Sequence, residues 1–129
     1  MKSLLLTLIV AFSTQAFAGV ELGKYAAKDK DTGSIDAKFE LKADKSLTFS
    51  VNNPDLPKPI NCTGKWDAAG TTFSAALKCD SEMLAEANVK IDISNVTAAN
   101  LRSPTGVQVG VIIDALGEDA MQFLLKKAD

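Results

Sequence analysis

The chain has 129 residues, 14 of them basic and 16 acidic, with a formal net charge of −2 and no histidine. The lack of histidine excludes histidine-based acid–base catalysis, the serine and cysteine triads that need it, and zinc sites with histidine ligands. No basic run with interleaved aromatic residues occurs, so we expect no nucleic-acid partner. A binding protein without enzymatic activity or a cofactor is the simplest expectation.

The first 18 residues have the form of a signal peptide. Lys2 supplies a positive start, residues 4–12 form an apolar run, and residues 16–18 form an A-x-A cleavage motif. The apolar run is too short to cross a bilayer, and no second such run follows. We therefore expect cleavage after Ala18, a secreted or periplasmic location, no membrane span, and one monomeric domain over residues 19–129.

Apolar residues recur at every second position through most of the remaining chain, which is the period of half-buried β-strands. The segments with this pattern are 22–28, 35–42, 47–51, 60–66, 73–79, 89–93, 107–113 and 121–125. Each has one apolar face, which is typical of an antiparallel sheet with one face in water. Eight such strands close most simply into an all-β up-and-down barrel without edge strands, and a two-sheet β-sandwich is the alternative.

The connections between these strands are mostly short. Three of them are rich in turn residues, as hairpin loops should be, at 29–34, 43–46 and 67–71. The longer loop 52–59 holds three of the four prolines and is expected to be stiff and exposed. Residues 81–87 are predicted to form one or two helical turns with Ser81 as the N-cap.

The two cysteines, Cys62 and Cys79, lie on the inward phase of two consecutive predicted strands. In an exported chain such a pair is expected to form a disulfide, and two buried free thiols are the alternative. The residues face each other if the hairpin turns between Gly70 and Thr71, where glycine suits a positive φ. The bridge would close a loop of roughly 17 residues and stabilise the fold by about 3 kcal/mol in the chain-entropy model.

Alternate loops of an up-and-down barrel emerge at the same end, so loops 29–34, 52–59, 80–87 and 114–119 should meet. We call this end the acidic rim, because its only basic residues are Lys30 and Lys58. Its acidic residues are candidates for binding a basic protein: Asp29, Asp31, Asp55, Asp80, Glu82, Glu86, Asp114, Glu118 and Asp119. The alternative is that Asp and Glu simply suit hydrated turns.

Asp29 and Asp31 resemble the start of a calcium loop, in which alternating carboxylates converge on a hard cation. Gly33 stands where a third oxygen ligand belongs, and no flanking helices are predicted. A plain turn is therefore preferred, and we expect no metal site.

Large side chains on the inward phase are candidates for an apolar pocket: Phe39, Phe49, Trp66, Phe73 and Phe123. The interior of an eight-stranded barrel is either filled by side chains or holds one small ligand. The short strands favour a filled interior, with Trp66 closing the end near the 67–71 turn.

Gly23-Lys24-Tyr25, followed by alternating strands, resembles the G-x-W start of lipocalin-type barrels, with Tyr25 in place of tryptophan. This resemblance implies an eight-stranded barrel that carries a small apolar ligand. Small periplasmic inhibitors of proteases or lysozyme are similar in size, strand number and single disulfide. We therefore expect an inhibitor-type module that binds a basic protein at the acidic rim. A carrier of a small apolar ligand is the alternative, and a hydrolase that uses only carboxylates is a further, disfavoured one.

Overall fold

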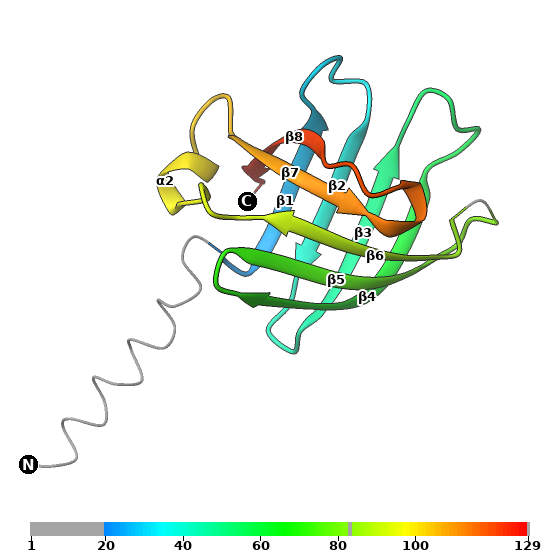
Figure 1. Cartoon of the computed structure of the whole chain (residues 1–129), viewed down its shortest axis with the longest axis horizontal. Coiled ribbons are helices and arrows are strands. Elements are labelled where there is room, and N and C mark those ends of the chain that lie inside the picture. Colours follow the sequence, from blue (N-terminus) through cyan, green and yellow to red (C-terminus); the bar gives the residue numbers. More distant parts are fainter. Residues whose placement is uncertain (1–19, 83, 129) are drawn as a thin grey trace, which may run out of the picture.

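The computed structural model describes residues 20–82 and 84–128, so the signal peptide predicted for residues 1–18 lies outside the described residues. Eight antiparallel strands form one closed barrel in which each strand pairs with the next and the last pairs with the first (Figure 1). The predicted up-and-down barrel is confirmed, and the two-sheet sandwich is not formed. No helix in this part of the chain has the length and apolarity needed to cross a membrane.

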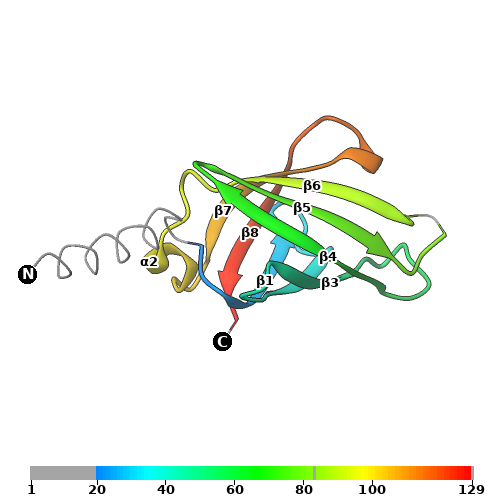
Figure 2. The same ribbon diagram turned by 90° about the horizontal axis from the view of Figure 1, so that it is seen from below.

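The strands follow the predicted segments closely. They are β1 (Gly23–Asp29), β2 (Asp36–Leu41), β3 (Ser46–Asn52), β4 (Ile60–Ala69), β5 (Thr72–Cys79), β6 (Glu86–Asp92), β7 (Val107–Ile113) and β8 (Met121–Lys127). Two short helical segments are also present, α2 (Ala98–Leu101) and the 3₁₀ turn η1 (Asp114–Leu116). Figure 2 shows α2 at one end of the barrel and the β5–β6 loop at the opposite end.

The helical turns predicted for residues 81–87 are wrong. None of the described residues of this segment is helical, and β6 already begins at Glu86. The Cys79 backbone N–H donates to the Ala85 carbonyl at 2.8 Å, which continues the β5–β6 ladder into the loop. Ser81 therefore caps no helix, because the strand pairing uses the backbone groups that a helix would need.

The β4–β5 hairpin matches its prediction. Ala69 pairs with Thr72, so the turn is centred between Gly70 and Thr71, and Gly70 has a φ of +61°. Cys62 and Cys79 are direct partners in the register and form a disulfide. Because Cys79 is the last residue of β5, the bridge lies toward the acidic rim of the barrel, away from the 67–71 turn.

Aromatic side chains fill the half of the barrel nearest this turn. The rings of Trp66 and Phe73 are stacked with centroids 5.9 Å apart, and those of Tyr25 and Phe39 with centroids 5.0 Å apart. Phe39 and Phe73 connect the two pairs at 6.4 Å. Trp66 is buried, and the Nζ of Lys45 lies 4.4 Å from its ring centroid. Trp66 thus closes this end, as predicted.

The connection between β6 and β7 covers the closed end from outside. Thr97 begins α2 because its Oγ1 accepts the N–H of Asn100 at 3.0 Å. Leu101 in this helix has no exposed surface. Arg102 forms two hydrogen bonds of 2.8 Å with the carboxylate of Glu21, which joins the helix to the segment before β1. Among the described residues, the β6–β7 connection therefore covers the barrel at this end.

Candidate functional site: an apolar cavity at the loop end

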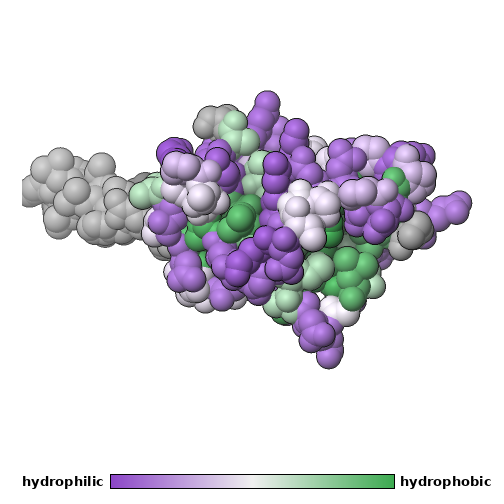
Figure 3. All heavy atoms as spheres, turned by 90° about the horizontal axis from the view of Figure 1, so that it is seen from above, coloured by the Kyte–Doolittle hydropathy of each residue, from purple (hydrophilic) through white to green (hydrophobic). Residues whose placement is uncertain are grey.

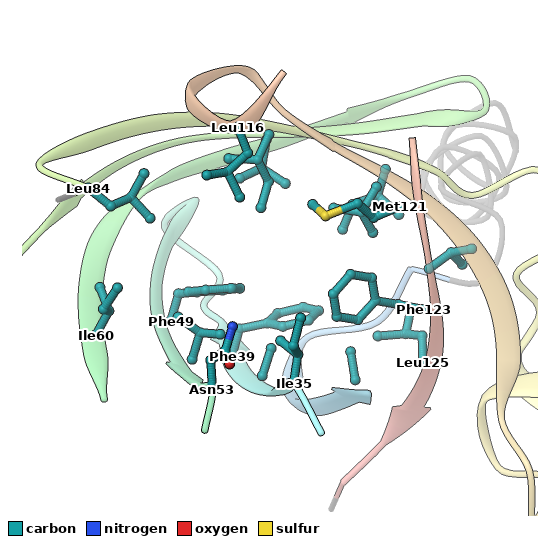
Figure 4. A pocket seen from close by; sticks show the side chains of 18 of the residues that line it. Ile35, Phe39, Phe49, Asn53, Ile60, Leu84, Leu116, Met121, Phe123 and Leu125 are labelled. Carbon is teal, nitrogen blue, oxygen red and sulfur yellow. The ribbon is translucent and has the colours of Figure 1, made fainter. Parts of the chain in front are cut away.

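The half of the barrel near the acidic rim contains a cavity of about 230 Å³ (Figure 4). Every strand except β5 contributes to its wall; the inward residues Phe73, Ala75 and Leu77 of β5 are buried and lie outside the lining. Side chains from the rim loops complete it at the mouth, and these are Ile35, Asn53, Leu56, Leu84 and Leu116. We predicted that side chains fill the whole interior of the barrel, and this is wrong for the half near the acidic rim.

The lining is apolar except for Asn53 and contains no charged side chain among the described residues. Several inward-facing side chains of the strands are only partly buried because the cavity, and not another side chain, lies against them: Phe39, Phe49, Val51, Ile113 and Met121. An apolar cavity with so few polar partners does not hold ordered water well. Displacing weakly held water with an apolar molecule is favourable, so the site suits such a ligand.

Three of the five predicted pocket residues line the cavity, namely Phe39, Phe49 and Phe123. The prediction is wrong for Trp66 and Phe73, which do not line it and stack on each other in the closed half. Their inward phase is as predicted, but they lie at a different height along the barrel axis. Phe39 lies between the two halves, since it lines the cavity and also stacks on Tyr25.

Leu56, Leu84 and Leu116 were not predicted as site residues. Each is the single leucine of its rim loop, and this pattern is the signal that could have identified them. Leu116 in η1 is 64% exposed, which is unusual for a large apolar side chain beside a cavity. The outer surface is mostly hydrophilic in the view of Figure 3, with hydrophobic residues gathered in a few patches. The mouth is thus lined by leucines on its inner side, and exposed acidic residues of the rim loops surround it.

The nine acidic candidates all lie on the rim loops or at the adjoining strand ends, and all but Asp29 are exposed. Some of these carboxylates stabilise the barrel itself. Asp80 accepts the backbone N–H of Asn61 at 2.9 Å, and Asp114 accepts that of Asn88 at 2.9 Å. These backbone hydrogen bonds lower the pKa of both carboxyls. Asp114 also extends the short β6–β7 ladder beyond its last paired residues.

Asp29 binds the backbone of its own loop. Its carboxylate accepts the N–H of Ile35 at 2.8 Å, and the N–H and Oγ1–H of Thr32 at 2.9 and 2.7 Å. These bonds, that of Ile35 first, lower its pKa from 3.8 to about 2. The described residues contain no group of three or more acidic, histidine or cysteine side chains that could hold a metal ion. The carboxylate of Asp29, one of the two residues that resemble a calcium loop, thus stabilises the turn between β1 and β2.

No protein-family model matches the chain, and no curated protein and no solved structure matches it. The architecture is consistent with a lipocalin-like barrel. The arguments on function therefore rest on the cavity and on the residues around it.

Proposed function

We propose that this protein is a lipocalin-like, non-enzymatic carrier that binds one small apolar molecule in the cavity at its acidic rim. The observation that carries the proposal is the hollow half of the barrel, lined by apolar side chains and a single amide. An apolar cavity of about 150 Å³ lined by Leu, Ile and Phe is large enough to bind benzene. A volume of about 230 Å³ therefore suits a larger ligand, such as a fused two-ring molecule or a short acyl chain.

The surroundings of the cavity support a carrier. The closed end is sealed by Trp66 and covered by α2, so a ligand enters and leaves at the rim. Leu84 and Leu116 extend the apolar lining onto two of the rim loops. Loops adjust more easily than strands, so these side chains can adapt to ligands of different shape. The disulfide fits an oxidising compartment. We propose that the chain is exported, with cleavage after Ala18, and carries its ligand outside the cytoplasm.

The test is a fluorescence titration with N-phenyl-1-naphthylamine, a neutral probe that brightens in apolar surroundings. For about 17 non-hydrogen atoms at roughly 0.3–0.5 kcal/mol each, we expect a Kd from about 1 to 200 μM and one site per chain. Val51→Phe should weaken binding at least about tenfold because the added ring occupies the cavity that Val51 lines. Thr48→Phe, an exposed position of the same strand, is the matched control and should bind as wild type. Absence of saturable binding by wild type would contradict the proposal.

A second candidate is an inhibitor-type module whose acidic rim binds a basic protein. Eight of the nine predicted carboxylate residues are exposed at one end of the barrel, which favours attraction of a cationic surface. Titration with a cationic hydrolase such as lysozyme should then show an affinity that falls steeply with salt. Glu118→Gln combined with Asp119→Asn should weaken this interaction and leave the probe in the cavity unaffected. An affinity independent of salt would contradict this candidate.

A further inference from the structure

The cavity has one polar side chain in its wall, that of Asn53, just beyond the end of β3. The Oδ1 of Asn53 accepts the backbone N–H of Asp55 at 3.0 Å, and its backbone carbonyl accepts the N–H of Leu56 at 2.9 Å. A backbone N–H can only donate, so Oδ1 must face Asp55 and the amide cannot be flipped. The Nδ2 group is therefore the atom left to face a ligand, and Figure 4 shows it on the cavity side.

A donor in an apolar wall constrains what can fill the cavity. Water can satisfy Nδ2 while the mouth is open, but an apolar ligand that covers it displaces this water. A polar group that loses its partner on burial costs free energy unless the ligand replaces the hydrogen bond. A well-fitting ligand therefore carries a hydrogen-bond acceptor at the depth of Asn53, close to the rim.

The charges around the mouth decide which acceptor is suitable. The rim loops carry nine acidic residues and only Lys30 and Lys58 as basic ones, and no basic side chain lines the cavity among the described residues. A carboxylate ligand would enter a negative potential and bury its charge without a cationic partner, and both effects oppose binding. A carbonyl, ester or ether oxygen accepts the same N–H without this penalty.

We infer that Asn53 is a specificity-determining residue: its Nδ2–H donates to the acceptor oxygen of a neutral apolar ligand such as a ketone, an ester or an ether, and the site disfavours carboxylates. This inference rests on the carrier function proposed above. It assigns the chemical class of ligand, since a hydrocarbon leaves the donor unpaired and a fatty acid meets the negative rim.

The experiment measures displacement of N-phenyl-1-naphthylamine by three molecules of matched size, which are 2-acetylnaphthalene, 2-ethylnaphthalene and 2-naphthoate. Asn53→Asp retains Oδ1 for the Asp55 N–H and replaces the donor by an acceptor, so the loop should be preserved. Asn52→Asp is the matched control, because it adds the same charge at the neighbouring exposed position outside the lining. The readout is the affinity ratio of ketone to hydrocarbon in each protein.

In wild type and in Asn52→Asp this ratio should be equal, and in Asn53→Asp it should fall by about 2- to 10-fold, as expected for the loss of one hydrogen bond. The naphthoate should bind wild type at least about tenfold more weakly than the ketone, with a gap that narrows as salt is added. An unchanged ratio in Asn53→Asp, or tightest binding by the naphthoate, would overturn the assignment alone. Failure of the probe to bind wild type would overturn the carrier function and the assignment with it.

Discussion

Phe39 stacks on Tyr25 with ring centroids 5.0 Å apart and ring planes 6° from parallel, and the same phenyl ring lines the cavity. Beneath it lies a much smaller cavity of about 20 Å³, which Phe39 and Tyr25 also line. Phe39 is therefore the aromatic part of the floor of the binding site, and the aromatic cluster of the closed half supports it. Ile91 and Leu125 line both cavities as well and complete this floor.

Removing this aromatic part of the floor should enlarge the site and weaken the fold. Phe39→Ala should connect the two cavities and lower the free energy of unfolding by about 2–4 kcal/mol, slightly less than for a fully buried phenylalanine. Ligands one ring longer than the naphthyl probe should then bind more tightly than to wild type. Urea unfolding and probe displacement measure the two effects.

Phe73→Ala is the control for this variant, because Phe73 belongs to the same cluster but does not line the main cavity. It should be destabilised by about 3–5 kcal/mol with no change in the preferred ligand length. If both variants accept longer ligands equally, Phe39 is not part of the floor.

The disulfide should contribute to stability in proportion to the loop that it closes. Cys62 and Cys79 are separated by 17 positions, which corresponds to about 3 kcal/mol in the chain-entropy model. The free energy of unfolding of the double variant Cys62→Ala, Cys79→Ala should therefore be lower by that amount, and its urea midpoint should fall accordingly. Wild type unfolded in excess reductant should match the variant, and equal midpoints with and without the bridge would contradict the prediction.

Acid should destabilise the protein through Asp29. Its folded-state pKa of about 2 lies below the ordinary value of 3.8 because backbone and hydroxyl groups donate to the carboxylate. A carboxyl with a lowered pKa stabilises the fold above its unfolded-state pKa, and this stabilisation is lost as the pH falls through the folded-state value. We expect the thermal midpoint of wild type to fall between about pH 4 and pH 2.

Asp29→Asn should make that fall shallower, because the group no longer titrates. Part of the dependence should remain, since hydrogen bonds also lower the pKa of Asp44, Asp80, Asp92 and Asp114. Asp31→Asn, at an exposed position of the same loop, should show the wild-type curve. Identical curves for Asp29→Asn and wild type would show that the Asp29 turn does not govern acid stability.

The period-two pattern predicted every strand and the side chains that point inward, because alternation reflects the two faces of a strand directly. It could not distinguish Phe39 from Phe73, since both point inward and only their height along the barrel axis differs. That height depends on the stagger between paired strands, which alternation within one strand does not contain. The pairing of Cys62 with Cys79 could be predicted because both lie in one hairpin, where the position of the turn determines which residues face each other.

The loops were harder to predict than the strands. Leu84 lies in a segment with helical propensity, but pairing of β5 with β6 determines its backbone. The short helix α2 rests on one N-cap, Thr97, and on the burial of Leu101 against the closed end. Such features depend on tertiary contacts that form only once the barrel is closed.

The close approach of β4 and β5 should make one glycine indispensable. A Cβ at Gly64 would overlap the carbonyl oxygen of Ala76 and lie 3.0 Å from the Cα of Leu77, both backbone atoms of β5. The strands cannot separate there, because the disulfide and the paired residues on both sides hold them together. Gly64→Ala should cost about 4 kcal/mol or more, or prevent accumulation of folded protein.

Gly110 in β7 offers the matched substitution. A Cβ at Gly110 would lie 3.6 Å from the Cβ of Ala120 and 3.6 Å from the Nε2 of Gln122, which is ordinary van der Waals contact. Gly110→Ala should therefore be tolerated and could raise stability by about 0.5–1 kcal/mol, because alanine loses less backbone entropy on folding. Urea unfolding of the two variants measures the difference, and a Gly64→Ala protein as stable as Gly110→Ala would show that β4 and β5 can move apart at this position.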